Sequence, residues 1–79
     1  MEQAVLPEKR LSYTGHARRR MALREVTEDM VRETVRSPQV AGFGWLGRPI
    51  AARAYARGTL KVVYSDEPGE YRVITVFWD

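Results

Sequence analysis

The sequence changes its pattern at Val40, and this change limits the fold more than any other feature. Before it, Thr27 followed by two acidic residues is typical of a helix start, because the hydroxyl caps the first turn and the acids suit the helix dipole. Ser37-Pro38 ends that helix, since a residue that precedes proline avoids helical backbone angles. The sequence therefore predicts a helix over residues 28–36.

A second helix is predicted nearer the N-terminus. Thr14 stands where a capping residue would stand, and Ala17 and Met21, four residues apart, would share one buried face. We expect this helix over residues 16–24, after a short strand at residues 11–14.

From Val40 onward the residues favour strands. The segment from Ile50 to Arg57 alternates, and the segment from Tyr71 to Trp78 is rich in β-branched and aromatic residues. Glycine and proline between these segments mark turns. The prediction is an α+β domain in which two helices cover the apolar face of a three- to four-stranded antiparallel sheet.

The turn after the alternating segment decides which side chains share a face of this sheet. A two-residue loop at Gly58-Thr59 would put Leu60 on the same face as Arg53 and Arg57, whereas a three-residue loop that begins at Arg57 would put Leu60 on the alanine face. We predict the three-residue loop, because it separates polar from apolar side chains better. The other face would then be basic, and it would carry Arg53, Tyr55, Arg57 and Lys61.

The chain has 79 residues, which is the size of one small domain. We expect residues 1–10 to form a flexible arm and residues 11–79 to form the domain. Cysteine is absent and there is one histidine, so we expect neither a metal nor another cofactor. The sequence has no membrane-spanning stretch and no signal-peptide pattern, so we expect a cytoplasmic protein with no membrane partner.

Basic residues are concentrated in two blocks. Residues 8–24 contain six basic side chains and one acid, and residues 48–61 contain four basic side chains and no acid. Almost all of the basic side chains are arginines, whose planar guanidinium suits bidentate contacts with phosphate. This favours a phosphate-rich partner, although a GC-rich genome would produce the same composition without one.

Residues 16–26 read H-A-R-R-R-M-A-L-R-E-V. This segment is similar to the signature H-A-x-x-R-M-x-x-R-G-I of an uncharacterised small-domain family related to RelE-type and ParE-type toxins, including the BrnT-like ribonuclease toxins. The Gly-Ile of the signature is Glu25-Val26 here, so the turn after the helix departs from the pattern. Weaker matches lie at residues 60–64 (L-K-V-V-Y) and 73–76 (V-I-T-V).

The resemblance implies a RelE-like fold and a toxin of a toxin–antitoxin pair that cuts RNA without a metal, like an mRNA interferase. That reaction needs a base for the 2′-hydroxyl, cations for the phosphate and an acid for the leaving oxygen. The catalytic residues would be His16, Arg20 and Arg53. RNA would be bound by Arg18, Arg19, Arg24, Tyr55, Arg57 and Lys61.

Each of these residues also has a structural interpretation. His16 would bond to backbone at a helix start, Arg20 and Arg24 would pair with carboxylates, and Tyr55 would pack against its arginine neighbours. Two other functions therefore stay open. One is a non-catalytic binding module for protein or nucleic acid, and the other is a ParE-like inhibitor of a protein target.

The expected partners are RNA or the ribosome, and an acidic antitoxin protein. The apolar segment 40–46 contains two glycines and would form an edge strand. Because the free backbone groups of an edge strand pair readily with another chain, we expect this segment to contact a second copy in a homodimer, or the antitoxin.

Overall fold

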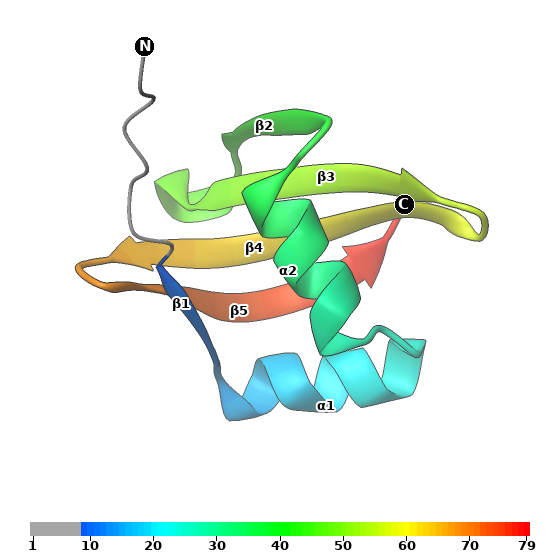
Figure 1. Cartoon of the computed structure of the whole chain (residues 1–79), viewed down its shortest axis with the longest axis horizontal. Helices are drawn as coiled ribbons and strands as arrows, with labels where there is room; N and C mark the ends of the chain where they lie inside the picture. Colours follow the sequence, from blue (N-terminus) through cyan, green and yellow to red (C-terminus); the bar gives the residue numbers. More distant parts are fainter. Residues whose placement is uncertain (1–8) are drawn as a thin grey trace, which may run out of the picture.

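Five strands and two helices make up the fold in the computed structural model (Figure 1). The structure describes residues 9–79, except for the side chain of Trp45, so residues 1–8 of the expected arm lie outside the described residues. The elements in chain order are β1 (Arg10–Tyr13), α1 (Gly15–Arg24), α2 (Glu28–Arg36), β2 (Val40–Phe43), the short 3₁₀ turn η1 (Trp45–Gly47), β3 (Pro49–Tyr55), β4 (Gly58–Glu67) and β5 (Glu70–Trp78).

The sheet has the strand order β1-β5-β4-β3-β2. Strands β2 to β5 are antiparallel neighbours, as the sequence predicts. Strand β1 instead joins β5 in parallel, so the sheet is five-stranded and mixed rather than three- to four-stranded and antiparallel. The four residues of β1 are too few to show from their own pattern which strand they pair with.

Both helices lie where their capping residues place them. The hydroxyl of Thr14 accepts a hydrogen bond from the N–H of Ala17, and the hydroxyl of Thr27 accepts one from the N–H of Met30. Helix α2 crosses one face of the sheet, whereas α1 runs along the edge of β5 (Figure 1). No helix in the described part of the chain is long and apolar enough to cross a membrane.

The core lies between the helices and the sheet face that they cover. Side chains from α2, β4 and β5 are fully buried there, and the polar Thr34 among them donates a hydrogen bond to the carbonyl of Met30 at 2.8 Å. The prediction that the helices cover the apolar face is confirmed. The largest fully buried residues are Leu60, Val31, Val62, Val73, Val76 and Thr34.

The three-residue loop predicted after β3 is wrong. The turn consists of two residues, because Tyr55 is paired with Gly58 and Arg53 with Leu60. Paired residues share a face, so Arg53 and Tyr55 lie on the helix-covered face with Leu60. Lys61, opposite Phe77, lies on the other face. The predicted basic sheet face is therefore not formed. Glu33 of α2 and the carbonyl of Ser37, just after α2, accept hydrogen bonds from Tyr55 and Arg53, so these polar groups are satisfied on the covered face.

Strand β5 contains a bulge. Val63 is paired with Thr75 but Tyr64 is paired with Val73, so Ile74 is an extra residue in β5. A bulge of this kind bends its strand and re-aims the side chains beside it. Ile74 and Thr75 both line the same hollow on the uncovered face, while Val73 and Val76 on either side of them are in the core.

Candidate functional site

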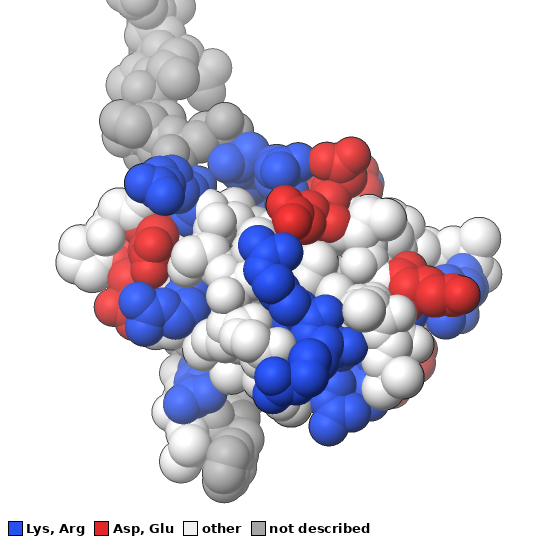
Figure 2. Space-filling view, turned by 90° about the horizontal axis from the view of Figure 1, so that it is seen from below, with Lys and Arg blue, Asp and Glu red and all other residues white. Residues whose placement is uncertain are grey.

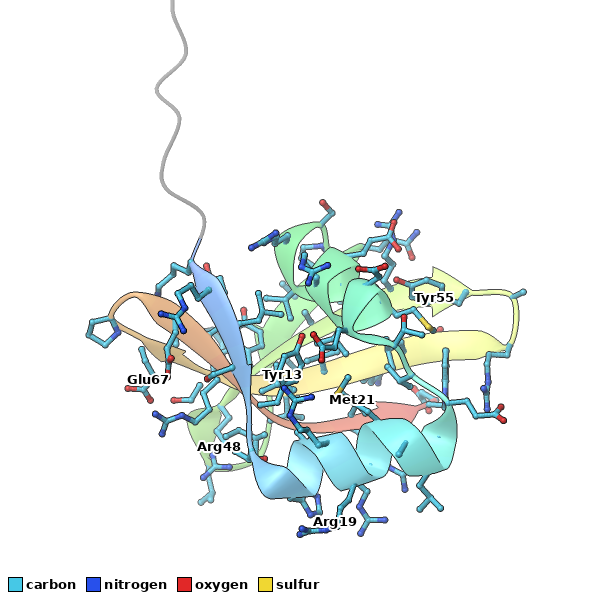
Figure 3. All side chains as sticks on the ribbon, turned by 60° about the horizontal axis from the view of Figure 1, so that its bottom comes forward. Tyr13, Arg19, Met21, Arg48, Tyr55 and Glu67 are labelled. Atoms are coloured by element: carbon cyan, nitrogen blue, oxygen red, sulfur yellow. The ribbon has the colours of Figure 1, made fainter. Side chains whose placement is uncertain are left out.

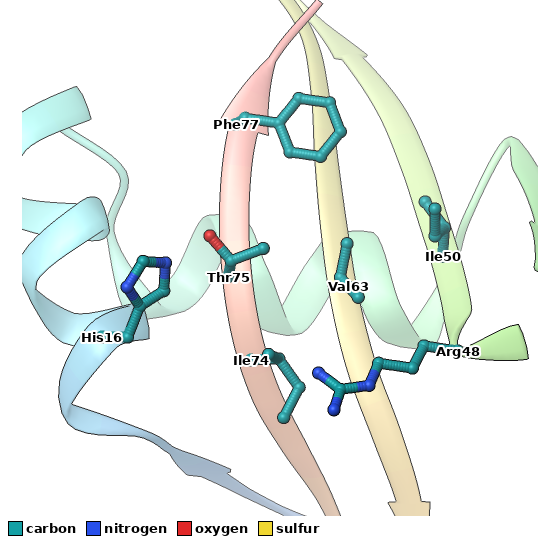
Figure 4. A pocket seen from close by; sticks show the side chains of 7 residues that line it. All are labelled: His16, Arg48, Ile50, Val63, Ile74, Thr75 and Phe77. Carbon is teal, nitrogen blue, oxygen red and sulfur yellow. The ribbon is translucent and has the colours of Figure 1, made fainter. Parts of the chain in front are cut away.

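The sheet face opposite α2, hereafter the open face, contains a hollow of about 360 Å³ (Figure 4). Its floor comes from three neighbouring strands, with Ile50 of β3 beside Val63 of β4 and Val63 beside Thr75 of β5. The floor residues are half-buried, and most of them are apolar. The hollow is lined by His16, Arg48, Ile50, Val63, Ile74, Thr75 and Phe77.

His16 stands at one side of the hollow because Thr14 fixes the start of α1 to the bulge in β5. The hydroxyl of Thr14 donates to the carbonyl of Ile74 at 3.2 Å, and its N–H donates to the carbonyl of Val73 at 3.1 Å. The same hydroxyl caps the helix, so the imidazole of His16 is held near Ile74 and Thr75. The imidazole remains exposed to solvent.

Arg48 stands at the other side. Its side chain reaches from the start of β3 across β4 towards β5 (Figure 4). The loop before it turns through two left-handed residues, Leu46 at φ 62° and Gly47 at φ 70°, and closes with a 2.8 Å hydrogen bond from the N–H of Gly44 to the carbonyl of Arg48. A Cβ at Gly44 would lie 2.2 Å from Cδ1 of Ile50, so a side chain there would displace the end of Ile50 from its place in the floor.

Most basic side chains are engaged by acids or carbonyls. Arg18 pairs with Glu28 at 3.1 Å and stacks on Tyr13, and Arg57 pairs with Glu25 at 3.2 Å. Among the described residues Arg10, Arg19, Arg20 and Arg48 have no ion pair or hydrogen bond from the side chain. A band of basic side chains crosses the face of the molecule formed by α1 (Figure 2), and Arg19 points away from α2 there (Figure 3).

The chain matches the family model described as a domain of unknown function (DUF4258) over residues 13–78. It belongs to the DUF4258 family. The expectation of an uncharacterised small-domain family is thereby confirmed. No curated protein and no solved structure matches the chain.

In this DUF4258 domain the three residues predicted to be catalytic do not come together. His16 and Arg20 lie on α1, four residues apart, and His16 lines the hollow. Arg53 lies on the helix-covered face, where its Nη1 donates to the carbonyl of Ser37 at 2.7 Å and its Nε is 3.5 Å from Oε2 of Glu33. The sheet therefore separates Arg53 from His16.

Besides Arg18 and Arg57, three further residues predicted to bind RNA make structural contacts. Nη1 of Arg24 donates to the carbonyl of Val76 at 2.8 Å. The hydroxyl of Tyr55 donates to Oε1 of Glu33 at 2.6 Å, and burial together with this hydrogen bond raises the pKa of Tyr55. Nζ of Lys61 pairs with Oδ2 of Asp79 at 2.9 Å, at the Phe77 end of the open face.

Sequence reasoning missed Arg48 as a site residue. The sequence placed it in the second basic block beside a Gly-Arg-Pro turn, which indicates a loop but not the direction of the side chain. Within the described residues no group of three or more histidine or acidic side chains is arranged to hold a metal ion. What the site offers is an apolar floor between an imidazole and a guanidinium, with further arginines along α1.

Proposed function

We propose that this DUF4258 domain binds single-stranded RNA over the open face and the adjoining side of α1. The observation that carries the proposal is the position of its unpaired arginines. Arg48 borders the apolar hollow, and Arg19 and Arg20 extend along the helix whose first turn forms the opposite border.

Single-stranded RNA suits this chemistry because its bases are free to leave the stack and contact side chains. A base would lie on the apolar floor against Phe77, with stacking on an aromatic ring contributing about 1–3 kcal/mol. The flanking phosphates would lie near Arg48 on one side and near Arg20 on the other. A duplex would present phosphates but no free base to the hollow, so the fit favours a single strand.

Cleavage of the bound RNA is the second part of the proposal, and the toxin resemblance motivates it. His16 lines the hollow, and histidine is the side chain that most often transfers protons in general acid–base catalysis. The neutral imidazole would take the proton of the 2′-hydroxyl as its oxygen attacks the adjacent phosphorus. The imidazolium would then return a proton to the departing 5′-oxygen. Arg48 or Arg20 would stabilise the negative charge on the five-coordinate phosphorus of the transition state. The products would be a 2′,3′-cyclic phosphate and a 5′-hydroxyl.

Arg48→Ala and Arg53→Ala form a matched pair that tests the binding face. Both remove one guanidinium, but Arg48 borders the hollow and Arg53 is held by Glu33 and Ser37 on the covered face. We expect Arg48→Ala to weaken binding of a fluorescent RNA oligomer about 10- to 150-fold, in line with a charge-assisted hydrogen bond of about 1.5–3 kcal/mol, and Arg53→Ala to change it little. Equal affinities for both variants, or no RNA binding by the wild type, would contradict the proposal.

His16→Ala separates binding from cleavage. If His16 transfers the proton, this variant keeps the affinity for RNA and loses cleavage by a factor of at least about 100, the lower range for general acid–base catalysis. Binding without cleavage in the wild type would leave a non-catalytic RNA-binding module. A growth arrest without RNA binding would point instead to inhibition of a protein target. An antitoxin partner and action at the ribosome remain predictions tied to the toxin resemblance, and the cytoplasm remains a prediction from the sequence pattern.

A further inference from the structure

Strand β2 is an edge of the sheet, and the apolar side chains exposed on this domain are concentrated beside it. Among the described residues the large hydrophobic side chains that are exposed are Val40 (67%), Phe43 (80%), Leu46 (67%) and, on α1, Leu23 (71%). Strand β2 is short, at four residues, but it contains no charged residue and no proline, which are two common protections of an exposed edge. Exposed apolar side chains along an edge strand without charges indicate an edge that another chain covers.

The pairing of β2 with β3 determines which backbone groups face outward. The N–H of Gly44 bonds to the carbonyl of Arg48, and Pro49, the partner of Phe43, has no N–H to donate. Bonded and non-bonded pairs alternate in an antiparallel ladder, so the N–H and C=O of Gly42 point towards β3. The N–H and C=O of Ala41 and Phe43 therefore point to the open edge.

We infer that β2 pairs in antiparallel fashion with β2 of a second copy of this chain, about a twofold axis through Gly42. In this register Ala41 faces Phe43 of the second copy and Gly42 faces the same glycine. All four outward backbone groups of each strand are then bonded, and the ring of Phe43 packs across a small residue. Shifting the register by two residues would oppose Ala41 to itself or Phe43 to itself, and would leave part of these groups unpaired.

The chemistry of the edge favours an identical partner over an acidic one. Strand β2 carries no basic side chain, so an acidic chain would gain no ion pair along it, whereas two uncharged strands meet without like-charge repulsion. A Cβ built on Gly42 would have nothing within 4 Å, so the open face beside this glycine is unobstructed. The pairing does not rest on RNA binding.

The dimer would also enlarge the candidate site. A twofold axis perpendicular to the sheet keeps the two open faces on the same side. Ile50, which is in the floor of each hollow, is the partner of Gly42 on the next strand. With a strand spacing of about 4.8 Å, the two Ile50 residues would be about 14 Å apart across the glycine pair. The two hollows would then border one continuous groove.

The oligomeric state in solution tests the pairing, with Phe43→Lys and Leu23→Lys as a matched pair. Both put lysine in place of an exposed apolar residue, one on β2 and one on α1. We expect light scattering at millimolar protein to give twice the chain mass of 9.1 kDa for the wild type and for Leu23→Lys, and 9.1 kDa for Phe43→Lys. A wild-type mass of 9.1 kDa, or a dimer that persists in Phe43→Lys, would overturn the inference.

A single cysteine locates the axis, because the chain has no cysteine of its own. In a non-bonded antiparallel pair the Cα atoms are about 4.5 Å apart, which is within the disulfide range of about 4.4–6.8 Å. We expect Gly42→Cys to form a covalent dimer under mild oxidation and Leu23→Cys to remain monomeric on a non-reducing gel. A wild type that dimerises while Gly42→Cys fails to crosslink would overturn the proposed axis. Circular dichroism of each variant confirms that it is folded.

Discussion

The indole Nε1 of Trp78 donates a hydrogen bond to the carbonyl oxygen of Arg24 at 3.1 Å, across 54 positions of the chain. In return Nη1 of Arg24 donates to the carbonyl of Val76 at 2.8 Å. The last residue of α1 is therefore tied to β5 by two hydrogen bonds, and the exit of the helix is fixed against the sheet. The final arginine of the H-A-x-x-R-M-x-x-R segment therefore has a structural contact, and Met21 of the same segment is buried in the core.

Replacing Arg24 with alanine should destabilise the domain. The substitution removes the charged donor to Val76 and leaves that half-buried carbonyl without this partner, which typically costs about 1.5–3 kcal/mol. Urea denaturation followed by circular dichroism measures the change. Arg19→Ala on the same helix is the control, since Arg19 is exposed and should change stability by no more than about 0.5 kcal/mol. Equal stabilities of the two variants would show that the Arg24 contact contributes nothing.

Stability should fall as the pH rises above about 10, the ordinary pKa of tyrosine. Burial raises the pKa of Tyr13, Tyr55 and Tyr64, so the folded protein holds these phenolic protons more tightly than the unfolded chain. Their contribution is fully present below the unfolded pKa and is lost as the pH rises through the folded pKa values. Urea midpoints measured from pH 8 to 11 test this, and an increase of the midpoint with pH would contradict it.

Tyr55→Phe should make that alkaline decline shallower. The variant loses the hydrogen bond to Glu33 and is therefore less stable at neutral pH, by about 0.5–1.5 kcal/mol. Above pH 10 it no longer has the phenol whose ionisation disfavours folding, so the difference from the wild type narrows. A difference that stays constant over the alkaline range would mean that Tyr55 does not contribute to the pH dependence.

The salt dependence of RNA affinity should show whether the arginines of α1 contact phosphates of the RNA. Each phosphate contact with a single strand contributes about −0.7 to the slope of log K against log salt concentration. Arg20→Ala should therefore make the slope shallower by about that amount. Arg32→Ala is the matched control, because Arg32 lies on α2 and pairs with Asp29 at 2.6 Å. Identical slopes for the two variants would place the RNA away from α1.

The helices could be predicted from the sequence because local residues define them. Thr27 caps a helix that spans Glu28–Arg36, as predicted, and Thr14 caps α1 in the same way. The glycine of the family signature corresponds to Glu25 in this chain. Glu25 adopts a left-handed conformation at φ 57° at the end of α1, which is the conformation that glycine adopts most easily.

The faces of β3 and β4 could not be predicted, because their register depends on contacts with α2. Arg53 and Tyr55 are accommodated on the covered face by Glu33 and by the carbonyls of Ser37 and Met30, all of which lie on or just after α2. A pattern of polar and apolar residues along one strand contains no information on such acceptors. The observed register, in which Arg53 is paired with Leu60, places both polar side chains within reach of these acceptors.

The hollow on the open face could not be predicted from the sequence either. It depends on the bulge at Ile74, which turns two consecutive residues of β5 towards it, and on the left-handed loop that directs Arg48 across β4. His16 was identified from its chemistry, whereas its position beside the hollow follows from the hydrogen bonds that Thr14 makes to β5.

The most direct test of RNA binding at the open face is a titration of the ¹⁵N-labelled domain with a short single-stranded RNA, followed by amide chemical shifts. We predict that the shifts concentrate at His16, Arg48, Val63 and Thr75 and along the exposed side of α1, and that residues of α2 change little. The account would be contradicted if the shifts gathered on α2, or if saturating RNA left the amides around the hollow unchanged.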